Sequence, residues 1–354
     1  MSRFLSPALE KITPYTPGEQ PKGGNLIKLN TNESPFPPSP GVIKALSENE
    51  SSRLNLYSDP TLSSFTDALS ERFQVNKDQV YAGNGSDEVL AVAMYAFGAD
   101  GFYAPDITYG FYPVIANFFG ISYHTRPLKG DFTICTEDFF RAPGAVVIAN
   151  PNAPTGISLP LSEIERILRE NPDHVVIVDE AYVEFGGESA AKLISKYEQL
   201  LVIGTFSKAW NLAGARLGYA VGNAELIRDM NRLRFSFHPY NINRLSLIAG
   251  TKAVEEEEYY IECRKKIIDT RVRTIQTLVG MGFIATDSKA NFIFVKPPII
   301  SAKELFDSLR ARGIITRYFS GARVKEYLRI TIGSDEQMDA LLYAVSDILK
   351  EAKK

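Results

Sequence analysis

Residues 201–218 read Leu201-Val202-Ile203-Gly204-Thr205-Phe206-Ser207-Lys208-Ala209-Trp210-Asn211-Leu212-Ala213-Gly214-Ala215-Arg216-Leu217-Gly218. The apolar, β-branched start of this stretch predicts a buried parallel strand. Lys208 follows at the carboxyl end of that strand, where open α/β sheets bind their ligands. The hydroxyls of Thr205 and Ser207 and the guanidinium of Arg216 can hold a phosphate, and an enclosed lysine can form a Schiff base. We therefore hypothesise that Lys208 carries pyridoxal phosphate (PLP); a solvated surface lysine is the simpler alternative.

The composition is that of an ordinary globular protein. The 354 residues suffice for two domains with a sizeable core, and the net charge of −3 without a basic block gives nucleic-acid binding no support. Two cysteines argue against a disulfide framework, and three scattered histidines provide no metal-ligand spacing. The N-terminus shows no signal pattern, and no stretch has the length of a membrane span. We therefore expect a cytoplasmic protein with small-molecule substrates, without metal, membrane or nucleic-acid partners.

A glycine turn upstream is the second candidate for holding a phosphate. The sequence Gly83-Asn84-Gly85-Ser86-Asp87-Glu88 follows a predicted short strand and precedes an apolar helix predicted over Val89–Phe97. A strand, a glycine turn and a helix N-terminus together form an anion site, because free N–H groups point at one spot. Gly85 allows close approach of the backbone, and Ser86 or Asp87 can cap the helix. The turn is neither a P-loop nor Gly-x-Gly-x-x-Gly, which disfavours a nucleotide site.

Two further predicted strands end in polar side chains. Asn152 lies in the irregular turn 150–156 after the strand Ala145–Ala149, and its amide can donate to the ring oxygen O3′ of PLP; local capping of the turn is the alternative. Asp179 ends the run after Val175–Val178, and a carboxylate beside the pyridine nitrogen keeps that nitrogen protonated, so that the ring withdraws electrons. Tyr182, three residues further on, can also donate to O3′.

Aromatic residues supply candidates for contact with a flat ring. Tyr109 lies in an aromatic-rich loop, and we interpret it as a stacking partner for the cofactor. For the neighbouring Phe111 and Tyr112 we favour core packing. Tyr57, framed by turn-forming residues, is by itself more typical of a packing residue than of a ligand.

The order of elements predicts the domain organisation. Strands near residues 80, 147, 177, 203 and 220 alternate with helices, which predicts a mainly parallel, doubly wound α/β sheet. We predict an N-terminal arm over 1–40 that packs on the small domain, a large PLP-binding domain over 41–245 and a small α+β domain over 246–354. The small domain is expected to begin with one connector helix near 246–281, in which Gly250 is the only candidate breaker. Arg317 and Arg329 lie in or beside its strands, where solvation and anion binding are equally compatible with the pattern.

Taken together and in this order, the motifs resemble those of the fold-type-I PLP-dependent aminotransferases. The two specific stretches are Asn150-Pro151-Asn152-x-Pro154-Thr155-Gly156 and Ser207-Lys208-x-x-x-Leu212-Ala213-Gly214-x-Arg216-x-Gly218. Within that superfamily the chain is most similar to the histidinol-phosphate aminotransferases, through residues 29–35, 55–57, 83–88, 239–243, 316–319 and 328–333. It departs from the family at Ser58, where proline is more common, and at Trp210, where a smaller residue is common.

The resemblance implies a fold and a set of roles. It implies a seven-stranded, mainly parallel large domain, and amino transfer between histidinol phosphate and 2-oxoglutarate in histidine biosynthesis. Lys208 would hold PLP and shuttle the proton between Cα and C4′, while Asp179 would hold the ring nitrogen protonated. The remaining cofactor contacts implied are Asn152 and Tyr182 at O3′, Tyr109 on the ring, and Gly85, Ser86, Asp87, Thr205, Ser207 and Arg216 around the phosphate.

The resemblance also assigns the substrate and partner contacts. Arg329 would bind the carboxylate of glutamate and then the phosphate of histidinol phosphate, with Arg317, Tyr15 and Asn152 assisting. Tyr57 would reach the cofactor phosphate of a neighbouring subunit, which implies a homodimer with shared sites. The alternatives are an aromatic amino-acid aminotransferase or a threonine-phosphate decarboxylase of the same superfamily, and, outside enzymes, a PLP-binding regulator or degenerate scaffold.

Overall fold

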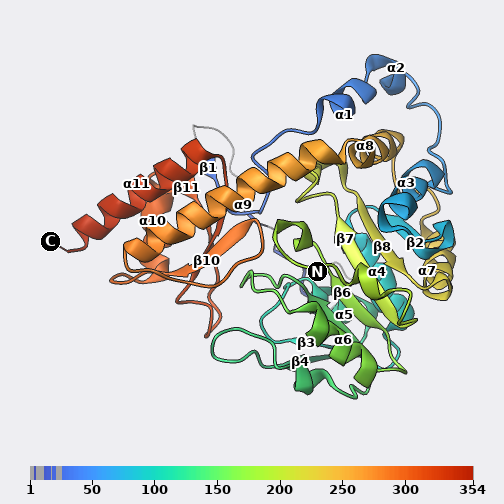
Figure 1. The fold of residues 1–354 in the computed structure, drawn as a ribbon, viewed down its shortest axis with the longest axis horizontal. Coiled ribbons are helices and arrows are strands. Elements are labelled where there is room, and N and C mark those ends of the chain that lie inside the picture. Colours follow the sequence, from blue (N-terminus) through green and yellow to red (C-terminus); the bar gives the residue numbers. More distant parts are fainter. Residues whose placement is uncertain (1–3, 5–11, 17, 21–25, 354) are drawn as a thin grey trace.

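The computed structural model describes Phe4 and residues 12–16, 18–20 and 26–353, and its centre is a seven-stranded sheet (Figure 1). The strands are β2 (Val80–Gly83), β3 (Phe102–Pro105), β4 (Tyr123–Arg126), β5 (Ala145–Ala149), β6 (Val176–Asp179), β7 (Leu200–Thr205) and β8 (Gly218–Gly222). Their order across the sheet is β2-β8-β7-β6-β5-β3-β4. Neighbouring strands are parallel except in the two pairs that β8 makes. The predicted mainly parallel, seven-stranded α/β sheet is thus confirmed.

Helices pack on both faces of this sheet because its strands are apolar on both sides. Along β5, Val146 and Ile148 join one buried cluster, whereas Ala145 and Val147 join the other, as the two-residue period of a strand requires. The first cluster includes residues of α3 (Ser63–Phe73), α6 (Leu161–Glu170) and α8 (Arg244–Glu255). The second includes residues of α4 (Ser86–Phe97), α5 (Tyr112–Phe119) and α7 (Ala224–Phe237).

The segment predicted as one connector helix consists of two helices, so that prediction was wrong. After α8 the chain turns at Glu256 and continues as α9 (Glu257–Gly280), which extends from α8 to the C-terminal helices (Figure 1). Gly250 does not break α8. It is buried inside the helix, where a Cβ would come within 2.5 Å of Leu217. The glycine therefore serves close packing of α8, not its termination.

The C-terminal part of the chain forms a smaller α+β unit. Its antiparallel sheet has the order β12-β13-β10-β9, and a short parallel pair joins β1 to β11. The elements are β1 (Ile27–Lys28), β9 (Ile284–Ala285), β10 (Phe292–Lys296), α10 (Ala302–Ala311), β11 (Ile314–Ile315), β12 (Arg317–Tyr318), β13 (Leu328–Thr331) and α11 (Asp335–Glu351). Residues 314–315 therefore pair with β1, whereas residues 317–318 belong to the antiparallel sheet. The antiparallel sheet carries both Arg317 and Arg329.

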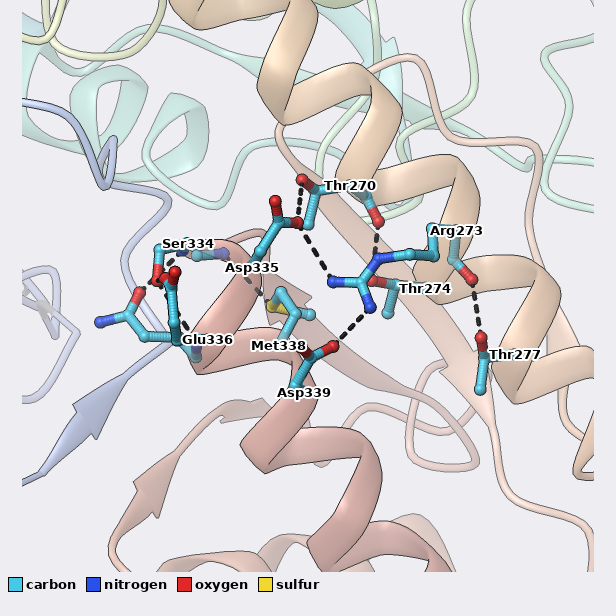
Figure 2. Close-up of polar contacts among 11 residues, drawn as sticks. Thr270, Arg273, Thr274, Thr277, Ser334, Asp335, Glu336, Met338 and Asp339 are labelled. Carbon is cyan, nitrogen blue, oxygen red and sulfur yellow. Dashed lines mark hydrogen bonds and ion pairs between the residues drawn. The ribbon is translucent and has the colours of Figure 1, made fainter.

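Polar contacts connect α9 to α11 on the surface of this unit (Figure 2). Arg273 of α9 forms ion pairs with Asp335, at 3.1 Å, and with Asp339, and the Thr270 hydroxyl donates to Asp335 at 2.8 Å. These charged groups are well exposed, so each pair contributes at most about 1 kcal/mol, and the buried side chains of the two helices contribute most of their packing energy.

The remaining described elements are short. They are the helices α1 (Pro40–Ala45) and α2 (Glu48–Ser51) and single 3₁₀ turns at Lys77–Gln79, Thr136–Phe139, Val183–Phe185, Ala190–Leu193 and Ala213–Ala215. Much of the predicted N-terminal arm, at 1–3, 5–11, 17 and 21–25, lies outside the described residues. The domain boundaries at residues 40 and 245 stay predictions.

Among the described residues, no helix is long and apolar enough to cross a membrane.

Candidate active site

A cavity of about 690 Å³ lies at the carboxyl ends of the parallel strands, against the C-terminal unit. Asp179 ends β6, Thr205 ends β7, and Ser86 begins α4, so two strands of the large sheet and one adjoining helix bring polar residues to the same cavity. The predicted site residues that line this cavity are Tyr15, Ser86, Asp87, Tyr109, Asp179, Tyr182, Thr205, Ser207, Lys208, Arg216, Arg317 and Arg329.

Lys208 lies in this cavity directly beyond β7. Its Nζ donates a hydrogen bond to the backbone carbonyl of Thr31 at 3.1 Å. Burial of the amine, and secondarily the positive charge of Arg329, lower the pKa of Lys208 to about 8, against partial compensation by Glu33 and Asp87. An amine with this pKa is neutral in about a tenth of the molecules at pH 7, and both nucleophilic attack on a carbonyl and proton abstraction require the neutral form.

Asp179 is held at the end of β6 by two donors. The Tyr112 hydroxyl donates to its Oδ2 at 2.7 Å, and the Ala181 N–H donates to its Oδ1 at 3.2 Å. Burial raises the pKa of Asp179 to about 6, although both hydrogen bonds oppose this shift, so the group is still largely ionised at neutral pH. Tyr112 is fully buried, as expected of a core residue, but its hydroxyl also orients Asp179, a role that we did not predict.

The residues predicted to hold a phosphate meet at the N-terminus of α4, which begins at Ser86 instead of Val89. Gly85 is the N-cap residue with φ of +80°, and no side chain caps the helix there. The Arg216 guanidinium lies beside it, 3.1 Å from Asp87 Oδ2 and 3.4 Å from Ser207 Oγ. The positive φ favours glycine at this position, and a Cβ there would also displace the Arg216 guanidinium, to which it would come within 2.5 Å. Free N–H groups, a hydroxyl and a guanidinium fit a phosphate ester.

Tyr109 stands at the side of the cavity. Its hydroxyl donates to Asp87 Oδ1 at 2.9 Å, and its ring meets Tyr112 edge to face, with centroids 5.5 Å apart. These two contacts fix the ring position before any ligand binds.

Asn152 is not among the residues that line this cavity, and its predicted contact with the cofactor or substrate stays a prediction. Its Nδ2 donates to the Ile107 carbonyl at 2.9 Å and to Thr155 Oγ1 at 3.2 Å, while its Oδ1 accepts from the Thr108 hydroxyl at 2.8 Å. The amide is thus used to hold the turn, which is the capping alternative raised above. The neighbouring Ala153, which has no polar side-chain atom, lines the cavity instead.

Two arginines of the small sheet also line the cavity. Arg317 of β12 and Arg329 of β13 are directly paired across the two strands. Arg329 Nη2 donates to the Asn30 carbonyl at 2.9 Å, whereas its buried Nε has no partner. Among the described residues, neither arginine forms an ion pair with a carboxylate. Two unneutralised guanidinium groups in one cavity form a site for an anion.

Tyr15 and Tyr57 have different surroundings. Tyr15 is 39% exposed, lines the cavity near the arginines and packs edge-on against Phe111 at 5.3 Å. Tyr57 is 81% exposed and stacks on Tyr240 at 4.6 Å, and it is not among the residues that line the cavity of its own chain.

The segment Asn30–Glu33 also lines the cavity, although we assigned it no role from the sequence. The carbonyls of Asn30 and Thr31 bind Arg329 and Lys208, and the Asn32 amide binds Tyr182. The available signal was the run of polar residues from Asn30 to Glu33, directly after Leu29.

Comparison with known proteins identifies the family of the chain. The chain matches the family model "Aminotransferase class I and II" over residues 24–345. The histidinol-phosphate aminotransferase of Brachyspira hyodysenteriae is 46% identical over 353 residues, which cover 99% of this chain and 100% of that protein. The enzyme of the same name from Clostridium acetobutylicum is 44% identical over 352 residues, with 99% and 100% coverage.

Solved structures show the same fold. The crystal structure of histidinol-phosphate aminotransferase from Clostridium acetobutylicum has a TM-score of 0.85 at 24% identity and covers 92% of this chain and 100% of that one. The structure of the Sinorhizobium meliloti enzyme in complex with pyridoxal-5′-phosphate has a TM-score of 0.84 at 24% identity, with 92% and 91% coverage. By its sequence relatives and its fold, the chain belongs to the class I and II aminotransferases and, within them, to the histidinol-phosphate aminotransferase family.

Proposed function

We propose that this protein is a PLP-dependent transaminase that transfers an amino group between histidinol phosphate and 2-oxoglutarate in histidine biosynthesis. The observation that carries this proposal is that one cavity holds a lysine of lowered pKa between two separate anion sites. The site at Gly85 and Arg216 suits the phosphate of the cofactor. The site at Arg317 and Arg329 is then available for the phosphate or carboxylate of the substrate.

The residues present fit PLP. The cradle at Gly85, with Ser86, Ser207 and Arg216, accepts its phosphate, with Asp87 and Thr205 holding these groups in place. Asp179 supplies an ionised carboxylate for a pyridinium nitrogen, and the Tyr109 ring offers a face for stacking. Tyr182 is the remaining donor for the ring oxygen, because Asn152 is used elsewhere.

Catalysis then divides among the chain's own groups. PLP, when bound, withdraws electrons from the amino-bearing carbon of the substrate. Lys208 is the base that takes the proton from that carbon and the acid that gives one back, a function for which a pKa of about 8 is well placed. Asp179 stabilises positive charge at the ring nitrogen, and Tyr182 stabilises negative charge at the ring oxygen. Arg329, with Arg317 and Tyr15, binds the anionic end of either substrate and so orients the reacting carbon.

We also propose a homodimer in which Tyr57 contributes to the partner's site. Tyr57 is strongly exposed, and Leu54, Leu56 and Tyr240 are exposed near it or in contact with it. Exposed aromatic and aliphatic side chains of this kind are typical of an interface between protein chains.

A cytoplasmic location is part of the proposal. It rests on Cys135 and Cys263, which are both unpaired thiols, because cysteines usually stay unpaired in a reducing compartment such as the cytoplasm.

A substrate panel tests the proposed reaction. We expect kcat/KM of the purified enzyme to be highest for histidinol phosphate, because the imidazolyl substrate carries the phosphate that two arginines can bind. A preference for phenylalanine or tyrosine would instead identify an aromatic amino-acid aminotransferase. Release of carbon dioxide from threonine phosphate would identify the decarboxylase, and a protein that stays colourless with added PLP would identify a scaffold.

A further inference from the structure

Asn32 is a buried residue that contacts an active-site tyrosine from outside the large sheet. Only 2% of its surface is exposed, and its φ of +56° places it in the left-handed region, which asparagine tolerates better than most residues. Its Nδ2 lies 2.9 Å from the hydroxyl oxygen of Tyr182. The residue thus lies directly behind a group that we assign to the cofactor's ring oxygen.

The orientation of the Asn32 amide is determined by Thr331. The Asn32 backbone N–H donates to Thr331 Oγ1 at 3.0 Å, so the Thr331 hydroxyl must direct its own hydrogen elsewhere. That hydrogen goes to Asn32 Oδ1, also at 3.0 Å. With its oxygen occupied by a donor, the amide presents its NH₂ group to Tyr182.

The position of Asn32 is held from the C-terminal unit. Asn291 Nδ2 donates to the Asn32 carbonyl at 3.0 Å, and the Thr331 N–H donates to the Leu29 carbonyl at 2.9 Å. Asn291 and Thr331 are both almost fully buried, so these bonds are shielded from water. The Tyr182 ring itself packs edge-on against Phe292, with centroids 5.1 Å apart.

A donor at the phenol oxygen determines what the Tyr182 hydroxyl can do. Because Asn32 donates to that oxygen, the hydroxyl hydrogen is free to point into the cavity, and polarisation by the first bond strengthens the second. We propose that Asn32 is a positioning residue, which holds the Tyr182 hydroxyl as a donor toward the ring oxygen of the cofactor. This inference rests on the proposed function, since it requires Tyr182 to contact that oxygen.

The proposal has a spectroscopic consequence. A stronger donor at the ring oxygen favours its ionised form, so the pH at which the lysine-bound cofactor changes its absorbance should be lower. Other charged or titratable groups act on Tyr182 as well, namely Arg329 from β13, Asp179 from β6 and Tyr15 from the N-terminal segment. Burial raises the pKa of Tyr182, whereas Arg329 and the hydrogen bond from Asn32 lower it.

The test is a double-mutant cycle read by absorbance titration of the PLP-loaded enzyme. Asn32→Gly removes the amide and keeps a residue suited to the positive φ. We expect it to raise the titration midpoint by about 0.5 to 1 pH unit, the size of one hydrogen bond. Tyr182→Phe should raise the midpoint too, and adding Asn32→Gly to Tyr182→Phe should cause no further rise.

Two more variants separate positioning from general disruption. Asn32→Asp replaces the NH₂ donor by an acceptor, which draws the Tyr182 hydrogen away from the cofactor, so the midpoint should rise at least as far as with glycine. Asn171→Gly is the matched control. It removes a buried amide that donates to the carbonyls of Phe139 and Ile167, away from the cavity, and should leave the midpoint unchanged. If Asn32→Gly does not fold, as judged by thermal unfolding, Thr331→Val removes the hydroxyl that orients the amide and should also raise the midpoint.

The outcomes distinguish failure of this inference from failure of the proposed function. If Tyr182→Phe shifts the midpoint and the Asn32 variants do not, Asn32 does not position Tyr182. If Asn32→Gly has the same effect with and without the Tyr182 hydroxyl, it acts by another route, and the inference is overturned. If Tyr182→Phe itself causes no shift, the assignment of Tyr182 to the ring oxygen is wrong, and the inference is overturned with it.

Discussion

Lys208 and Arg329 are two cationic side chains of the same cavity, and burial has different consequences for them. Burial lowers the pKa of both. Lysine can respond by releasing its proton, which makes it a base, whereas arginine stays charged. Arg329 has no carboxylate partner among the described residues, so an anionic substrate supplies the charge that its surroundings lack.

Replacing Arg329 tests this account of substrate binding. Arg329→Ala should lower kcat/KM for both glutamate and histidinol phosphate by about 30- to 900-fold, which corresponds to a loss of about 2–4 kcal/mol for a desolvated charge contact. Arg312→Ala is the control, because Arg312 is an exposed arginine that pairs with Glu351 at the surface, and it should leave both values unchanged. If Arg329→Ala and the wild type have equal kcat/KM for both substrates, Arg329 does not bind the substrate.

The position of a site residue could be predicted from the sequence where its neighbours in the chain determine that position. Lys208 and Asp179 follow apolar strands directly, and the end of a parallel strand sets their position. Asn152 could not be oriented from the sequence, because its amide bonds to Ile107 and Thr108, more than 40 residues earlier in the chain. The same holds for Asn32, whose partners Tyr182 and Thr331 are distant in sequence.

At the scale of elements, the carboxyl end of β6 is joined to the 3₁₀ turn Ala190–Leu193 by a buried acid. Glu180 Oε2 accepts from the Ser189 hydroxyl and Oε1 from the Ala190 N–H, both at 2.6 Å. Burial nevertheless raises the pKa of Glu180 to about 8. The folded protein therefore keeps a proton there that the unfolded chain releases near pH 4.5.

This shift predicts a pH dependence of stability. Between about pH 4.5 and 8 the folded state binds more protons than the unfolded state, so Glu180 makes the free energy of unfolding fall as pH rises through this range. Glu180→Gln should remove that contribution, so that its Tm relative to wild type increases from pH 5 to pH 8. The exposed Glu188→Gln should follow the wild type. If the difference in Tm between wild type and Glu180→Gln stays the same from pH 5 to pH 8, the raised pKa of Glu180 is contradicted.

The elements found from the sequence were those with an unambiguous pattern. β5, β6 and β7 are continuous apolar runs buried on both faces. β3 and β4 were not located from the pattern, because β3 ends in proline, and the edge strand β4 is polar and partly exposed. The break between α8 and α9 was also missed, because the residues around Glu256 are good helix formers and the Glu256 carboxylate accepts from the N–H of Gly41, which is distant in sequence.

At the scale of the whole molecule, the proposed dimer with shared sites requires Tyr57 to lie on the surface of its own subunit. Lys208 lies inside the cavity of its own chain, whereas Tyr57 lies outside it on the surface. A dimer of the proposed kind brings Tyr57 of one subunit to the phosphate cradle of the other.

Mixing two defective variants tests this arrangement. Lys208→Ala lacks the base and Tyr57→Ala lacks the partner contact, so each homodimer should be impaired at limiting PLP. After subunit exchange, each heterodimer carries one intact site, and random mixing should restore about a quarter of the wild-type activity per chain. Heterodimers isolated through two different affinity tags that show no recovery would contradict a shared site.

The most direct test of the central claim is the absorbance of the PLP-loaded enzyme during one half-reaction. We expect the long-wavelength band of the lysine-bound cofactor to disappear when histidinol phosphate is added and to return with 2-oxoglutarate. In Lys208→Ala the cofactor should bind without that band, and conversion should be slower by about 10² to 10⁴-fold, the contribution of a positioned acid–base group. A Lys208→Ala variant that keeps both the band and the wild-type rate would contradict the account.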